Sequence, residues 1–243
     1  MTGLGKLDGL ENLTVVAIAL TAFAAGLLYN TGSTTPAETG VGTANIVAVA
    51  EKRPVGIVGQ VRVTVEPGNG DVLVETNPFV QTDTQVSAKK AKNIAEAYTG
   101  KSLESMDVTY EFNISSEVIG GPSAGAAMTL ATIAAMTDKE VRKDAVITGT
   151  ITQSGNIGKV GEVPVKAKAA GKAGLDKFFV PEDQALKVNY EKVVEREREG
   201  LLVYRDVEYR RNIFNISSYT LQRFGMRTRE VSNISRAAEY MLK

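Results

Sequence analysis

The segment AGAAMTLATIAAM (residues 124–136) constrains the fold of this chain more than any other stretch. It is apolar nearly all round, and a helix without a polar face belongs in the core of a domain. Pro122 suits the first position of this helix, because the N–H group that proline lacks would be unpaired there anyway. The pattern therefore predicts a buried helix from about Pro122 to Met136.

Strand and helix patterns alternate around this segment, which predicts a mixed α/β (α+β) domain. Two strands joined by a Pro-Gly-Asn-Gly turn are expected within residues 56–76. A helix is expected at 83–98, with Val86, Ile94 and Ala97 as its apolar positions and Gly100 as its end. The remaining predicted elements are strands at 107–114, 145–152, 177–181 and 201–207, a helix at 164–173, and one or two helices in the charge-rich tail from Leu186.

Histidine and cysteine are both absent from the 243 residues. Their absence excludes Ser-His-Asp and Cys-His catalysis, ordinary zinc sites and disulfides. Proton transfer in an enzyme of this composition must use Lys, Asp, Glu or Tyr. Lys+Arg and Asp+Glu number 28 each, and no basic stripe is interleaved with aromatic residues, so no nucleic-acid partner is expected. No metal or cofactor is expected either.

The first part of the chain predicts attachment to a membrane. Residues 12–37 carry no charge, and their apolar centre at 13–29 approaches the roughly 20 residues that cross a bilayer. We therefore expect a membrane anchor or signal sequence at 1–31, a flexible linker at 32–45 and the main domain at 46–243. The leading segment is long and mixed in charge, which favours an uncleaved anchor with the domain outside the cytoplasm. Cleavage of the segment would instead give a secreted protein.

A single serine, Ser123, follows a glycine pair and Pro122 at the entry to the core helix. Free backbone N–H groups and the helix dipole favour negative charge at this place, so an oxyanion formed beside Ser123 would be stabilised. Two other interpretations fit the same stretch. Ser123 can be an ordinary helix-start residue, or the glycines can form a phosphate-binding loop, although no Gly-Lys-Ser/Thr follows.

A serine nucleophile needs a base, and lysine is the leading candidate in this chain. Lys166 lies in the first turn of the predicted helix at 164–173, where the dipole disfavours a cation. Its neighbours at helical spacing are Ala169, Ala170 and Ala173, so it points along an apolar face. Lys168 and Lys172 instead form a solvent-facing stripe. Periodicity alone leaves open whether Lys166 is buried or is a surface lysine whose stem covers apolar neighbours.

Together these segments resemble the proteolytic domain of the Lon protease family. GGPSAGAAM is similar to the family's nucleophile segment, VITGTIT to the strand that follows it, and GNIGKVGEVPVKAKAAGKAGLDKFFVP to the segment with the catalytic lysine. The resemblance runs from about Gly56 to Asp183. It implies Ser123 as nucleophile, Lys166 as general base and Thr148 as the residue that positions the lysine.

The resemblance also implies backbone donors near Gly121 and Ala124 for the oxyanion, polypeptide substrates, and a homo-oligomeric ring, commonly of six subunits. Two positions depart from the family pattern: Gly120 replaces a frequent acidic residue, and Thr150 replaces a glutamate. The chain contains no Walker motif, and in this it resembles archaeal extracytoplasmic Lon-like proteases. That resemblance implies cleavage of unfolded polypeptides without ATP. The alternatives are an inactive peptide-binding module of the same fold and a small-molecule kinase.

Overall fold

A computed structural model describes residues 39–50, 55–75, 79–115, 118–119, 121–199 and 202–243. The segment from Thr39 to Lys243 forms one compact unit. The predicted membrane segment at 13–29 lies outside the described residues. Within the described part of the chain, no helix is long and apolar enough to cross a bilayer.

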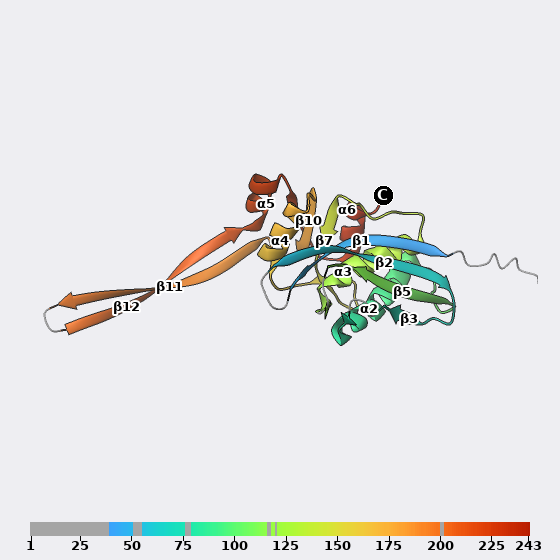
Figure 1. Cartoon of the computed structure of the whole chain (residues 1–243), viewed down its shortest axis with the longest axis horizontal. Coiled ribbons are helices and arrows are strands. Elements are labelled where there is room, and N and C mark those ends of the chain that lie inside the picture. Colours follow the sequence, from blue (N-terminus) through green and yellow to red (C-terminus); the bar gives the residue numbers. More distant parts are fainter. Residues whose placement is uncertain (1–38, 51–54, 76–78, 116–117, 120, 200–201) are drawn as a thin grey trace, which may run out of the picture. The chain divides into compact units, whose positions relative to one another are not determined.

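A seven-stranded sheet organises this unit (Figure 1). Its middle strands β1, β2 and β5 are antiparallel, whereas β7, β10 and β13 continue the sheet from β1 in parallel, and β3 lies parallel to β5 at the other edge. The order across the sheet is β13 (Arg227–Val231), β10 (Lys177–Pro181), β7 (Ala145–Ile147), β1 (Gly40–Val49), β2 (Gly56–Pro67), β5 (Met106–Asn113) and β3 (Val72–Val74).

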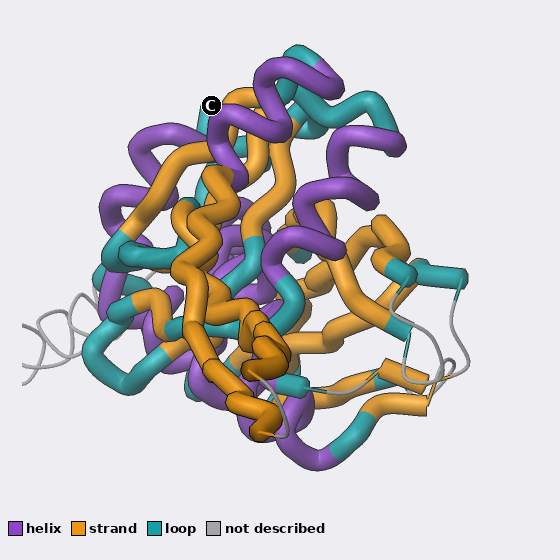
Figure 2. The backbone as a smooth tube through the Cα atoms, turned by 90° about the vertical axis from the view of Figure 1, so that its left-hand side faces the viewer, coloured by secondary structure: helices purple, strands orange, loops and turns teal. Residues whose placement is uncertain are grey.

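Helices pack on both faces of the sheet, because successive strand residues point to opposite sides. Ile147 and Phe179 belong to one hydrophobic core, and their neighbours Val146 and Phe178 belong to the other. Figure 2 shows the helices around the strands. The first core holds α2 (Thr82–Thr99), α3 (Gly125–Met136) and α6 (Ile234–Met241), and the second holds α4 (Val163–Lys172) and α5 (Ile216–Phe224).

Helix α3 is the most deeply buried helix, as its sequence predicts, and all 12 of its residues are buried. It approaches β1 closely at glycine positions: a Cβ atom at Gly42 would overlap the carbonyl oxygen of Ala131. Residues 40–45 are therefore the first half of a central strand, and their assignment to a flexible linker was wrong.

Several other predicted elements differ from the observed ones. The two strands within 56–76 are separated in the sheet by β5. In α2, Val86 and Ala97 are exposed, and only Ile94 of the three predicted apolar positions is buried. The predicted strand 145–152 is interrupted at Thr148 and Gly149. Two short pairings and one long hairpin complete the described unit. The short pairings are β4 (Phe79–Val80) with β6 (Val118–Ile119) and β8 (Thr150–Ile151) with β9 (Ile157–Gly158), and the hairpin is β11 (Leu186–Glu199) with β12 (Leu202–Asn215).

Candidate active site

The site is built where β7 ends, at the carboxyl edge of the parallel part of the sheet. Open α/β sheets commonly bind ligands at this edge, because helices start there on both faces. The backbone N–H of Gly149 donates to the carbonyl oxygen of Ser123 (2.9 Å), and the N–H of Ala126 donates to the carbonyl oxygen of Gly149 (3.1 Å). These two bonds fix the start of α3 against the end of β7.

Ser123 lies in a single 3-10 turn, Pro122–Ala124, that leads directly into α3. Gly121 precedes the turn with φ +83°, a conformation that glycine adopts without the steric cost of a side chain. Ser123 is half-buried and lines a cavity of about 320 Å³. The predicted nucleophile therefore has a hydroxyl group at the wall of a cavity, at the entry to a core helix.

Lys166 reaches the same cavity from the other face of the sheet, in the first turn of α4. It is only 4% exposed, so the buried alternative holds, and Lys168 and Lys172 are exposed as predicted. Burial lowers the pKa of Lys166 from 10.5 to about 8, and the carboxylate of Glu162 acts in the opposite direction. At a pKa of about 8, roughly one amine in ten is uncharged at pH 7.

Thr148 connects the two sides of the site. Its side chain is buried, and its Oγ1 accepts a hydrogen bond from Lys166 Nζ (3.1 Å) and donates to the carbonyl oxygen of Ser123 (3.4 Å). The structure thus brings Ser123, Thr148 and Lys166 together. Among the hydrogen bonds of the described residues, none joins Ser123 Oγ to Lys166 Nζ.

The predicted oxyanion donors lie beside Ser123, but one of them is engaged. The N–H of Gly121 donates to Asp83 Oδ1 (3.2 Å), and Thr84 Oγ1 donates to the carbonyl oxygen of Gly121 (3.1 Å). Ala124 is half-buried in the 3-10 turn. The first turn of α2 therefore holds the glycine that precedes the serine, whereas Gly120 lies outside the described residues.

Sequence reasoning missed two carboxylates at this site. Asp83 begins the predicted helix at 83–98, and an acidic residue in a first turn normally stabilises the helix itself. Glu162 precedes α4 in the left-handed conformation, with φ 56°, and lines the cavity with Lys166. Thr150, the departure from the family pattern, lines the same cavity. In the sequence, the only signal for a role of Glu162 was that this carboxylate lies four residues before the proposed base, Lys166.

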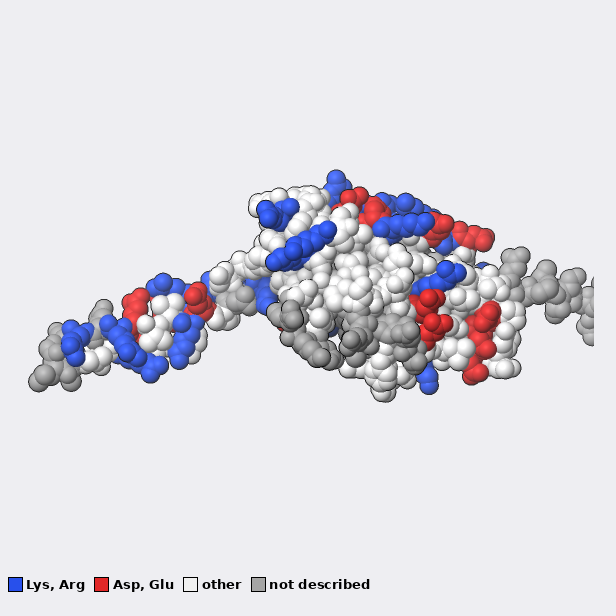
Figure 3. Space-filling model, viewed as in Figure 1, with Lys and Arg blue, Asp and Glu red and all other residues white. Residues whose placement is uncertain are grey.

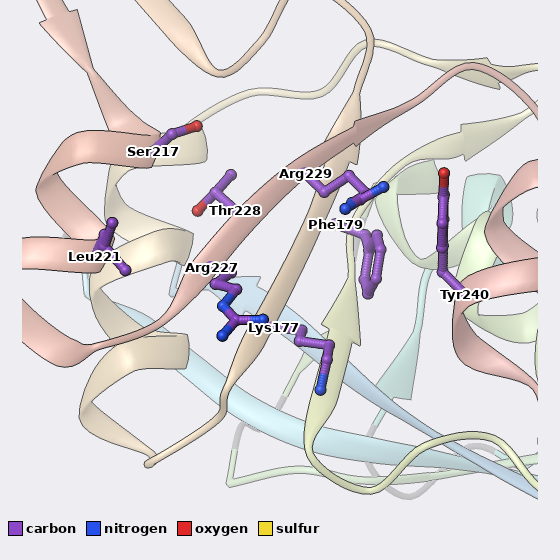
Figure 4. A pocket seen from close by; sticks show the side chains of 8 residues that line it. All are labelled: Lys177, Phe179, Ser217, Leu221, Arg227, Thr228, Arg229 and Tyr240. Atoms are coloured by element: carbon purple, nitrogen blue, oxygen red, sulfur yellow. The ribbon is translucent and has the colours of Figure 1, made fainter.

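A second cavity, of about 350 Å³, lies among β10, β13, α5 and α6 (Figure 4). Its serine, Ser217, and its lysine, Lys177, are poorly suited to react with each other. Figure 4 shows Ser217 and Lys177 apart from each other, and Lys177 Nζ is engaged in an ion pair with Asp144 (2.6 Å). Arg229 stacks on Tyr240, with its guanidinium carbon 4.4 Å from the ring centroid. The first cavity is therefore the candidate active site.

Comparison with known proteins shows which proteins this chain is similar to. The model of the Lon protease (S16) C-terminal proteolytic domain matches residues 32–216. The chain is 30% identical over 125 residues to a Lon protease of Phenylobacterium zucineum, which covers 50% of this chain and 16% of that protein. It is 28% identical over 127 residues to the archaeal Lon protease of Archaeoglobus fulgidus (52% and 20%) and 29% identical over 137 residues to that of Methanocaldococcus jannaschii (54% and 21%). The chain thus matches only about a fifth of the length of these relatives.

Proposed function

Because the chain belongs to the family of Lon protease (S16) C-terminal proteolytic domains, we propose that it is a serine endopeptidase with a Ser123–Lys166 catalytic dyad. One observation carries the proposal: a lysine that is 4% exposed, with a pKa lowered to about 8, lines the same cavity as Ser123. A surface lysine near pKa 10.4 would almost never be available as a base at neutral pH.

In the proposed reaction, uncharged Lys166 accepts the proton of Ser123 Oγ as this oxygen attacks the peptide carbonyl. Thr148 holds the amine until substrate binds, and the amine then turns from Thr148 Oγ1 towards Ser123. Backbone N–H groups near Gly121 and Ala124 stabilise the tetrahedral oxyanion once Gly121 leaves Asp83. Lys166 next protonates the leaving amine, and water hydrolyses the acyl-enzyme.

The proposed substrates are unfolded or loosely structured polypeptides, cleaved without ATP, because the sequence contains no Walker motif. A homo-oligomeric ring is proposed from the family. Anchoring through residues 13–29, with the domain outside the cytoplasm, is a proposal that rests on the sequence alone.

Covalent labelling tests the dyad. A fluorophosphonate probe forms a stable adduct with an activated serine, so we expect labelling of the unmodified protein and none of Ser123→Ala. Lys166→Ala should label at least about 100-fold more slowly, since the general base is lost. Lys168→Ala is the matched control, because this lysine lies on the same helix and is exposed.

The same experiment separates the alternatives. An inactive peptide-binding module would bind peptides with no adduct in any variant. A kinase would bind nucleotide and would not depend on Lys166. Labelling of Ser123→Ala at the rate of the unmodified protein would rule out Ser123 as the nucleophile.

A further inference from the structure

The hairpin of β11 and β12 is long, and its base packs on the domain, where the ring centroids of Phe214 and Tyr219 of α5 are 5.2 Å apart. The two strands pair over 14 residues each, and beyond this base the hairpin stands clear of the sheet and helices (Figures 1 and 3). An isolated two-stranded hairpin is at best marginally stable in water. A hairpin of this length therefore indicates an interaction that supports it.

One face of the hairpin is basic and apolar. Directly opposed residues of an antiparallel pair share a face, so the pairing register assigns every side chain. Every residue of the basic face is exposed, the face contains no acidic residue, and none of its cations forms an ion pair with a described residue. It consists of five cations, Lys192, Arg196, Arg198, Arg205 and Arg211, eight apolar or aromatic residues, Leu186, Val188, Tyr190, Val194, Val203, Val207, Tyr209 and Ile213, and Asn215.

The other face is acidic. Its described side chains include four carboxylates, Glu191, Glu195, Asp206 and Glu208, against two cations, Lys187 and Arg210. Arg210 contacts two of these carboxylates, Glu208 at 3.0 Å and Glu195 at 3.5 Å. The charges of the two faces are thus opposite in sign.

Two neighbouring pairs along the hairpin show the segregation most clearly. Arg196 lies directly opposite Arg205 on the basic face, and Glu195 lies directly opposite Asp206 on the acidic face. Like charges directly opposite each other destabilise a hairpin. A surface of opposite charge compensates this cost: an acidic surface compensates the Arg196–Arg205 pair, and a basic surface compensates the Glu195–Asp206 pair.

We propose that the basic face of the hairpin docks on the acidic face of the hairpin of a second copy of this chain. The Arg196–Arg205 pair then meets the Glu195–Asp206 pair of the neighbour, and Val194 and Val207 are covered by the interface. An anionic bilayer fits the basic face only and leaves the Glu195–Asp206 pair without a role. The second copy accounts for both faces.

The contact is heterologous, since each copy uses one face for each of its two neighbours. Such contacts close into a ring when the rotation between copies allows it. The proposal concerns assembly and does not depend on peptide cleavage, so the two can fail separately.

Charge exchange tests the docking. Arg196→Glu with Arg205→Glu makes the 196–205 pair acidic like the 195–206 pair, and Glu195→Arg with Asp206→Arg makes the 195–206 pair basic like the 196–205 pair. Each variant retains a like-charge pair on each face, so the local cost within the hairpin is matched. Sedimentation velocity of the full chain, in a neutral and density-matched detergent, should show self-association weakened at least about tenfold in either variant.

Two restorations complete the test. An equimolar mixture of the two variants should associate again, because the acidic 196–205 pair of one variant can meet the basic 195–206 pair of the other. A chain with all four substitutions should also self-associate, because the charges of its two pairs are exchanged and again complementary. Added salt should weaken association in each associating sample, since exposed charges are screened.

Lys168→Glu with Lys172→Glu is the control for Arg196→Glu with Arg205→Glu, because these exposed lysines on α4 give the same change in net charge. This control should assemble like the unmodified chain. Unmodified chain that stays monomeric, or single-face variants that assemble normally, would overturn the proposal. It would also be overturned if Arg196→Glu with Arg205→Glu lost binding to phosphatidylcholine–phosphatidylglycerol vesicles while its assembly was unchanged.

Discussion

The ionisation of Lys166 sets the pH dependence expected of catalysis. Only the uncharged amine can accept the serine proton, so kcat/KM for an uncharged peptide should rise with pH and level off above about 8, the pKa of Lys166. Glu162→Gln removes the carboxylate that raises this pKa, so the midpoint should move to lower pH. A profile from pH 6 to 10 measures both effects.

Glu182→Gln serves as the control for that shift, because this exposed glutamate does not line the candidate site. Its midpoint should equal that of the unmodified chain. A midpoint in Glu162→Gln that stays the same or moves upward contradicts the assigned electrostatic role.

Burial of Lys166 also has a cost in stability. Between about pH 8 and 10.5 the unfolded chain binds more protons at this residue than the folded chain, so the free energy of unfolding should rise with pH there. Lys166→Met keeps an apolar stem and removes the charge. It should raise the free energy of unfolding at pH 7 by about 2 kcal/mol and abolish that rise.

Urea denaturation at pH 7 and pH 10 measures this effect, with exposed Lys168→Met as the control that should change little. If Lys166→Met is less stable than the unmodified chain at pH 7, burial of the Lys166 amine does not destabilise the folded state, and the prediction is wrong.

The candidate residues Ser123 and Lys166 were predicted from sequence through the resemblance to the Lon protease family. The absence of histidine and cysteine, the helix entry and the alanine face only narrowed the candidates. Asp83 and Glu162 could not be identified in the same way. Their roles depend on where α2 and α4 start relative to Ser123, and that placement arises from packing across the chain.

At the scale of elements, the contact between α3 and β1 should tolerate no side chain. A Cβ atom at Gly42 would overlap the Ala131 carbonyl oxygen, which is backbone and cannot rotate away. Gly42→Ala should therefore lower the free energy of unfolding by about 3 kcal/mol, as measured by urea denaturation.

Gly161→Ala is the matched control. A Cβ atom at Gly161 meets nothing within 4 Å, and its φ is ordinary, so its stability should be nearly unchanged. Equal stability of the two variants would show that α3 can move away from β1 at little cost.

Elements with a strong local pattern agree with the sequence predictions. Strand β10 was predicted at its observed bounds, and α2, α4 and β5 within one residue at each end. Two segments were missed although each pairs with the next strand along the chain. Residues 40–45 look like a linker but pair with β2. In the charge-rich tail the strand predicted at 201–207 lies within β12, whereas the alternating charges of its partner β11 were not visible as a strand pattern.

At the scale of the whole molecule, the proposal of ATP-independent cleavage is directly testable. The full chain should degrade unfolded casein at the same rate with and without ATP and magnesium, because the sequence has no Walker motif. A tightly folded protein should resist, since the proposed cleavage without ATP acts only on polypeptides that are already unfolded. Release of fluorescent peptides measures both rates, and Ser123→Ala gives the background. Stimulation by ATP would contradict the prediction.

The two proposed reactive side chains, Ser123 and Lys166, come from helical segments on opposite faces of the sheet. Along the chain, the surface turn between α3 and β7 lies between them. A chain divided near Asp138 would place the hydroxyl on one piece and the amine on the other. Neither piece could cleave peptides alone, and restored cleavage activity would show that the two pieces had associated. The domain is thus suited to a split-reporter design, with complementation as its signal.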